Sequence, residues 1–294
     1  MSHIHHVAFE PLWAPVVLTL VFLLYLGGWL RIRRLNLESV AGWRAASCAL
    51  GLLLIWVVTS SPLAALDHDM LTAHMVQHLL LMTVAPPLIL LGAPVKPLLH
   101  ALPQRPVHAI GRPLRSAAMG QMGSALTHPA LCWFAAAGTL VVWHVPAVFM
   151  LGLRSDMWHG IEQASFLATG FLFWWPVVQP LPASWKWPES SILLYLFLAT
   201  LPCDILSGFL VFCDRVVYPV YRSSSQPLGL SALEDQECAG ALMWTCVTLV
   251  YLIAGAIVTA RLLSPRSSQE HAILQSQPQA IALAKSDAQR MEVV

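Results

Sequence analysis

The chain has 294 residues, of which 57% are hydrophobic and only 11% are charged. A soluble protein of this length needs more polar surface, so the composition predicts an all-α, polytopic membrane protein. The formal net charge is +1 and no nucleic-acid-binding motif accompanies the basic residues, so DNA and RNA are not expected partners. The N-terminus lacks the basic region and cleavage site of a signal peptide, and the first apolar run is predicted to be a retained helix.

Seven apolar runs are long enough, at about 20 residues, to cross a hydrocarbon core of roughly 30 Å. They cover residues 12–30, 44–60, 71–93, 130–152, 159–180, 191–213 and 238–260. We therefore expect a domain of seven transmembrane helices over residues 1–262. Residues 263–294 form a polar tail rich in Gln, Ser and Ala, which is predicted to be cytoplasmic and frayed or disordered.

The basic residues predict the orientation, because Lys and Arg accumulate on the cytoplasmic side of a membrane. With the N-terminus outside and the C-terminus inside, only three of the 16 Lys and Arg residues lie outside, namely Arg154, Arg215 and Arg222. The inner loop over 95–127 is basic and Pro-rich, and we expect it to lie along the membrane surface, partly as a short amphipathic helix. The outer loop over 214–237 ends in an acidic run.

Intramembrane polar residues fall at similar depth in the outer halves of several predicted helices. His74 and His78 are four residues apart, so they share one helix face, and ionisable groups inside a span indicate a functional site. The candidate metal ligands at this depth are His74, His78, His144, His159, Glu162 and Asp204.

Several imidazoles beside carboxylates, thioethers and thiols form a donor set for a metal ion. Imidazole suits copper, zinc and iron, while Met and Cys sulfur favours Cu(I), so copper is the predicted metal and zinc the alternative. We expect His78, His144 and His159 to bind the metal. His74, Glu162 or Asp204 would be a fourth ligand or would orient the imidazoles. Alternatively, the histidines are hydrogen-bonded core residues, or pair with the carboxylates only to order the helices.

The six cysteines contain no CxxC pair, which argues against a thioredoxin-like motif or a zinc ribbon. Cys213 and Cys238 flank the long outer loop. In an oxidising compartment they could form a disulfide, or they could remain two thiols able to hold Cu(I).

Short motifs between about residues 60 and 260 carry a resemblance to a known family. They are His74-Met75-Val76-Gln77-His78 running into Ala85-Pro86-Pro87, Trp143-His144-Val145-Pro146, His159 ahead of Phe173-Trp174-Trp175-Pro176, Tyr218-Pro219-Val220-Tyr221, and Asp235-Gln236 before Ala239-Gly240. On these residues the chain resembles the CtaG-type family of integral-membrane cytochrome c oxidase assembly factors.

The resemblance implies a multi-pass protein of the bacterial plasma membrane that helps to build a haem–copper oxidase, handling copper for its catalytic subunit. Its expected partners are cytochrome c oxidase subunits and other copper-delivery proteins. His74, His78, His144 and His159 match motif positions, whereas Glu162 and Asp204 are candidates from the residue pattern alone. We expect an assembly factor rather than an enzyme.

Three other functions remain open from the residues. The first is a zinc-dependent intramembrane hydrolase acting on a lipid amide or ester, in which bound zinc lowers the pKa of a water to about 7. The second is haem ligation by two histidines, and the third is a metal-free scaffold whose polar layer only orders the helices.

Overall fold

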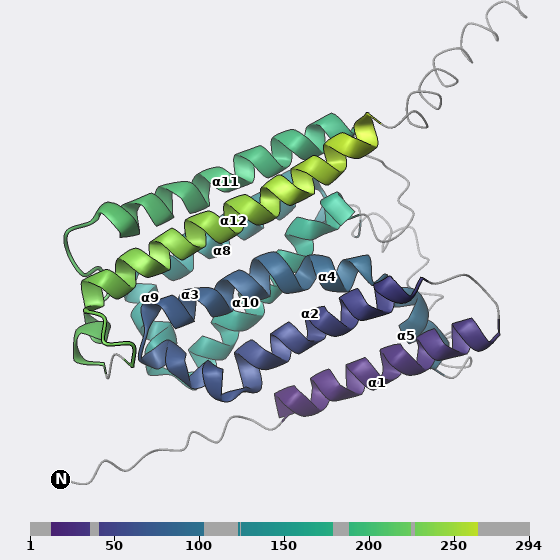
Figure 1. The fold of residues 1–294 in the computed structure, drawn as a ribbon, viewed down its shortest axis with the longest axis horizontal. Helices are drawn as coiled ribbons and strands as arrows, with labels where there is room; N and C mark the ends of the chain where they lie inside the picture. The colour runs from purple at the N-terminus through teal and green to yellow at the C-terminus, as the bar shows by residue number, and fades with distance from the viewer. Residues whose placement is uncertain are drawn as a thin grey trace, which may run out of the picture.

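The computed structural model describes residues 13–35, 41–102, 123, 125–178, 188–224 and 227–263. Within these ranges all regular secondary structure is helical, as the composition predicts, and there is no β-strand. The long helices lie side by side along the longest dimension of the molecule (Figure 1). Nearly all of the predicted polar tail, residues 264–294, lies outside the described residues.

Five helical segments are long and apolar enough to cross a membrane. They are Pro15–Arg34 in α1 (Trp13–Arg34), α2 (Gly42–Ser60), Leu71–Leu91, Ser190–Phe212 in α11 (Glu189–Phe212), and α12 (Ala232–Leu262). A sixth exists if the bent pair α8 (Pro129–His144) and α9 (Pro146–Arg154) counts as one span. The remaining long helix, α10 (Asp156–Val178), is not among these, since it carries polar residues such as Glu162 and Gln163. The described residues therefore form a helical multi-pass membrane protein with five or six candidate spans.

The fourth predicted span, residues 130–152, is a bent pair of helices and not one straight helix. Helix α8 ends at His144, and α9 leaves it at an angle of 78°. Pro146 explains the break, because proline has no N–H to continue the helix and disfavours helical backbone in the residue before it. Val145 accordingly has φ −65° and ψ 123°. His144 therefore lies at a helix end, directly before the bend.

The third predicted span contains an irregular turn directly after the histidine pair. Helix α3 (Leu71–Leu79) passes into a π-helical turn, η2 (Leu80–Val84), and then into α4 (Ala85–Leu91). Pro86 and Pro87 lack the N–H groups that would continue regular α-helical hydrogen bonding, and the N–H of Ala85 bonds to the carbonyl of Leu80 instead. Turns of this kind are frequent at functional sites.

Gly170 allows α10 to pack directly against this π-helical turn. A Cβ atom at Gly170 would lie 2.7 Å from the backbone oxygen of Met82 and 2.9 Å from Cγ of Pro86. Backbone and proline atoms cannot move aside, so a methyl group here would push the two helices apart.

Gly170→Ala is therefore expected to lower the free energy of unfolding by about 1–3 kcal/mol, the usual range for overpacking. Gly160→Ala on the same helix is the matched control, since a Cβ there meets nothing within 4 Å. The control should be neutral or slightly stabilising, because alanine favours helix over glycine by up to about 1 kcal/mol. Thermal unfolding in detergent would compare the two. Equal stabilities would contradict the close packing.

Helix α12 begins six residues earlier than the predicted span that starts at residue 238. Ser231 accepts a hydrogen bond from the backbone N–H of Glu234, and the Glu234 side chain accepts one from the N–H of Ser231, forming a capping box. The acidic run was predicted to be a loop, but it forms the first turn of this helix. The preceding loop contains one short helix, η3 (Pro219–Ser223).

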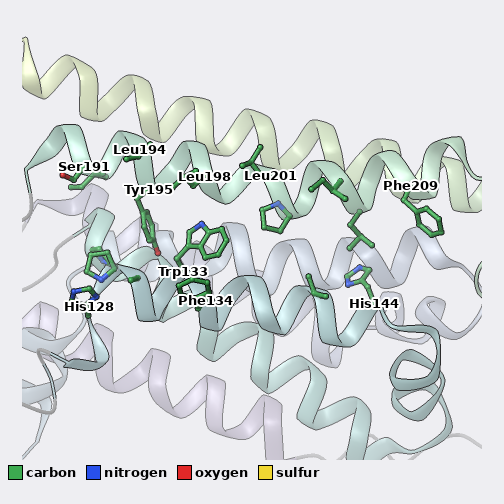
Figure 2. A pocket seen from close by; sticks show the side chains of 18 of the residues that line it. His128, Trp133, Phe134, His144, Ser191, Leu194, Tyr195, Leu198, Leu201 and Phe209 are labelled. Carbon is green, nitrogen blue, oxygen red and sulfur yellow. The ribbon is translucent and has the colours of Figure 1, made fainter.

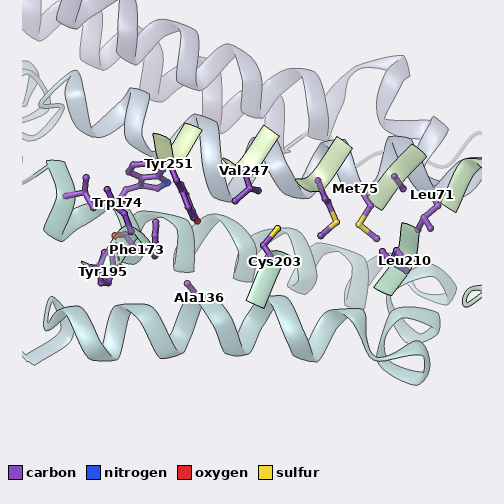
Figure 3. Packing of buried hydrophobic residues seen from close by; sticks show 14 of the residues in the cluster. Leu71, Met75, Ala136, Phe173, Trp174, Tyr195, Cys203, Leu210, Val247 and Tyr251 are labelled. Atoms are coloured by element: carbon purple, nitrogen blue, oxygen red, sulfur yellow. Dashed lines mark hydrogen bonds between the residues drawn. The ribbon is translucent and has the colours of Figure 1, made fainter. Parts of the chain in front are cut away.

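A buried core joins the C-terminal helices to α3. Phe173 stacks on Tyr195 and Tyr251 with ring centroids 4.9 and 5.4 Å apart, and Met75 and Cys203 belong to the same cluster (Figure 3). At the edge of the bundle away from α11 and α12, the short helix α5 (Val95–Ala101) packs along α1 (Figure 1). Gly28 of α1 provides the space for the Pro97 backbone. The packing against α12 holds α3 in the interior of the bundle.

All six cysteines are free thiols. The disulfide considered between Cys213 and Cys238 is therefore absent from the structure. Cys213 is partly buried and Cys238 is exposed.

Candidate metal centre

Three side chains from α3 and α10 converge inside the bundle. The Nε2 atoms of His74 and His78 lie 2.7 Å apart, and Oε1 of Glu162 lies 3.5 and 3.2 Å from them, respectively. The i and i+4 spacing on α3 puts both imidazoles on one face, and Glu162 approaches from the facing helix. All three residues are buried, with exposed fractions of 0%, 5% and 1%.

A second group adjoins the first and shares His74. It adds His159 from the first turn of α10 and Asp67 from η1 (Pro62–His68), with His159 Nε2 3.1 Å from Asp67 Oδ2. His159 Nδ1 also lies 3.7 Å from Oε2 of Glu162. Burial by itself would raise the pKa of Asp67, but the hydrogen bond and charge of His159 and the nearby charges of His68 and His74 lower it overall.

Apolar rings and amide side chains enclose the centre. Phe149 packs against His74 with ring centroids 4.8 Å apart, and Phe166 packs against His78 at 4.2 Å. On the second group, Gln163 Nε2 lies 2.8 Å from His159 Nε2 and donates to Gln77 Oε1 at 3.3 Å. These contacts keep bulk water out and restrict the orientation of the imidazoles.

His144 lies beside the centre but belongs to neither group. Its Nδ1 is 2.7 Å from the carbonyl oxygen of Leu140, and its Nε2 is 3.3 Å from Sδ of Met75. The Tyr218 hydroxyl donates to the His144 carbonyl at 2.9 Å, which fixes the end of α8. His144 and His78 line one small cavity of about 50 Å³.

Asp204 is not joined to the four histidines by any hydrogen bond, ion pair or candidate metal group among the described residues. Its Oδ1 atom is buried without a hydrogen-bond partner. Asp204 as a ligand remains a prediction that the geometry does not favour.

Asp67 was absent from the sequence-based candidates, because it precedes the third span in a segment predicted to be a loop. The structure folds this segment back over the end of the bundle, where the Tyr221 hydroxyl donates to the Asp67 carbonyl at 2.8 Å. An acidic residue seven positions before His74 was the available signal. Helical spacing could not reveal that Asp67 lies near His74, because η1 and α3 are separate elements.

A wide apolar groove of about 1140 Å³ runs along α8 and α11 (Figure 2). His128 lies near one end of the groove and His144 near the other, with Trp133 and Tyr195 between them. Trp133, His144 and Pro202 line both this groove and the small inner cavity. His144 therefore lies between the buried centre and the outer face of the helices.

The arrangement has the donor atoms and the charge that a cation requires. Tetrahedral coordination with bonds of about 2.0–2.1 Å places ligand atoms about 3.3 Å apart, and the three separations here are 2.7, 3.2 and 3.5 Å. Neither carboxylate, Glu162 or Asp67, forms an ion pair with Lys or Arg among the described residues. A buried negative charge is costly unless protonated histidines or a metal ion compensate it.

Comparisons with known proteins give relatives in mycobacteria. The chain is 26% identical over 233 residues to uncharacterized proteins of Mycobacterium bovis and Mycobacterium tuberculosis, covering 74% of this chain and 35% of each relative. It is 24% identical over 254 residues to an uncharacterized protein of Mycobacterium leprae, covering 85% of this chain and 38% of the relative. The chain thus spans little more than a third of the length of these relatives. No solved structure matches it significantly.

The family comparison covers most of the chain. Residues 23–264 match the model described as cytochrome c oxidase caa3 assembly factor. This range includes η1, the π-helical turn and every residue of both groups at the candidate centre. The chain belongs to the cytochrome c oxidase caa3 assembly factor family.

Proposed function

We propose that this protein helps to assemble a haem–copper cytochrome c oxidase by binding copper between α3 and α10 and delivering it to the oxidase. Copper is the cargo, and the protein is a metallochaperone rather than an enzyme. The observation that carries the proposal is the convergence of His74, His78 and Glu162 within 3.5 Å in a buried site. Family membership supports the oxidase as the recipient.

The chain itself would hold and release the cation. The imidazoles of His74 and His78 provide neutral nitrogen donors, and Glu162 provides a negative charge that favours a cation over a neutral ligand. Asp67 orients His159 through the 3.1 Å contact between them. The rings of Phe149 and Phe166 exclude water, which would otherwise compete for the metal.

In this proposal the protein crosses the bacterial plasma membrane seven times, with its N-terminus outside. Helix α10 is the fifth of these spans in chain order, and its His159 and Glu162 side chains face the centre rather than lipid. The described basic residues at the end of the bundle opposite the centre are Arg31, Arg33, Arg34, Arg44, Lys96 and Arg261. The other described basic residues, Arg154, Arg215 and Arg222, belong to the segments predicted to lie outside. The excess of basic residues at the first end favours a cytoplasmic location for it, which puts the centre near the external face. Copper would then enter from outside and leave toward an oxidase subunit or another copper-delivery protein.

The decisive experiment combines metal analysis with oxidase assembly. Copper, zinc and iron are measured in the purified full-length protein and in His78→Ala. In parallel, a strain lacking the gene is complemented with each form, and the copper-to-haem ratio and activity of its oxidase are recorded. We expect near-stoichiometric copper in the wild type, loss of copper in His78→Ala, and a copper-poor oxidase in that strain.

His100→Ala is the matched control, because His100 lies on α5 with its Nδ1 at the Lys96 carbonyl, outside both candidate groups. It should behave as the wild type in both measurements. An oxidase with full copper content in the deletion strain would refute the proposal. Tight zinc binding with turnover of a lipid amide or ester would replace it with the intramembrane hydrolase.

A further inference from the structure

A sulfur-rich cavity lies next to the candidate centre, on the side of α3 that faces α8, α11 and α12. It has a volume of about 50 Å³ and is lined by 18 residues. Its potential ligands are two imidazoles, three thioethers and one thiol, from His78, His144, Met75, Met82, Met243 and Cys203. Figure 3 shows Met75 and Cys203 in the packed interior beside α12. The volume is sufficient for a single ion or water molecule.

The hydrogen bonds of His144 leave a nitrogen lone pair opposite a sulfur atom. A carbonyl oxygen can only accept, so the 2.7 Å contact with Leu140 requires the proton on Nδ1 of His144. In the neutral ring Nε2 then carries a lone pair, and it lies 3.3 Å from Sδ of Met75, which also has only lone pairs. A second proton would place a charged imidazolium in a cavity whose walls are almost entirely apolar, which is unfavourable.

A soft cation resolves this contact between two electron-pair donors. With bonds of about 2.0 Å to nitrogen and about 2.3 Å to sulfur, the lengths known at zinc, the 3.3 Å separation corresponds to about 100° at the metal. That angle is close to tetrahedral. Soft sulfur ligands such as these thioethers and the thiol favour Cu(I).

We propose that His144 Nε2 and Met75 Sδ bind Cu(I) at a second position, completed by sulfur from the cavity wall. This inference rests on the proposed copper function and adds to it a separate, softer site. His78 connects the two positions, because it contributes to the His74–Glu162 centre, lines the cavity, and has an Nδ1 atom without a hydrogen-bond partner. His144 also borders the groove along α8 and α11, so the second position lies between the first centre and the lipid-facing side of the helices.

X-ray absorption of the purified full-length protein, loaded anaerobically with Cu(I), tests the site. The wild type should show copper–sulfur scattering at about 2.3 Å. Met75→Leu conserves shape and volume, so it should fold, but it should show weaker copper–sulfur scattering and bind Cu(I) at least tenfold more weakly in a competition assay. Met70→Leu is the matched control, because Met70 is also a buried methionine, at the N-cap of α3, but does not line the cavity.

The outcomes separate this site from the proposed function. Nitrogen and oxygen scattering alone in the wild type, or unchanged binding in Met75→Leu, would overturn the sulfur site and leave copper delivery intact. Normal oxidase copper in the deletion strain would refute the delivery function, whereas copper–sulfur scattering that depends on Met75 would still support the site. A thermal unfolding curve for Met75→Leu confirms that any loss of binding comes from the ligand and not from the fold.

Discussion

Glu162→Gln is expected to abolish tight copper binding at the centre formed with His74 and His78, while leaving the protein folded. The substitution keeps the shape of the side chain but removes the negative charge and one donor oxygen beside His74 and His78. Losing a residue that only orients a ligand weakens metal binding by about 10–100-fold, so losing a ligand should weaken it by at least about 100-fold. Copper affinity measured by competition with a chelator is the readout.

The stability of the same variant provides an independent check. In the metal-free protein a neutral amide at position 162 is less costly to bury than a carboxylate, so the melting temperature should stay the same or rise. Addition of copper should raise the melting temperature of the wild type by more than that of Glu162→Gln, which retains only the proposed His144–Met75 position. Glu237→Gln is the control, because Glu237 is exposed. Equal copper affinity in wild type and Glu162→Gln would exclude the proposed ligand set.

Asp235→Ala is expected to cause a large loss of stability, although Asp235 lies outside the metal centre. The Asp235 carboxylate is fully buried and accepts hydrogen bonds from the backbone N–H groups of Leu71 and Thr72, at 2.7 and 3.2 Å, and from the Thr72 hydroxyl at 2.6 Å. It thus caps the N-terminus of α3 from another helix, α12. Removing it leaves buried N–H groups without acceptors, a loss on the order of 3 kcal/mol.

Thermal or denaturant unfolding in detergent would measure this loss. Asp235→Asn should be intermediate, because it retains one acceptor oxygen but loses the charge. Glu237→Ala, two residues later and exposed, should change the free energy of unfolding by no more than about 0.5 kcal/mol. Because α3 carries His74 and His78, Asp235→Ala should also weaken copper binding, and a variant that retained full stability would show that this cap is unimportant.

The all-helical membrane fold follows from the sequence alone, since apolar runs of about 20 residues have few other stable arrangements in a bilayer. Helical spacing likewise predicts that His74 and His78 share a face, and the structure brings their Nε2 atoms to 2.7 Å. The sequence also contains the local signals for the break at Pro146 and the capping box at Ser231, but hydropathy averaged over a whole span concealed both.

Only the tertiary structure decides which polar residues meet. Glu162 joins the histidines of α3 because Gly152 leaves room for its carboxylate, since a Cβ at Gly152 would lie 2.5 Å from Oε2. Asp67 reaches His159 because η1 folds back over the end of the bundle. Asp204, at similar sequence-predicted depth, makes no such contact among the described residues. Depth in the membrane follows from position along one helix, whereas contact between two side chains depends on how both helices are rotated and packed. When a helix is buried on most sides, its hydrophobic pattern specifies that rotation poorly.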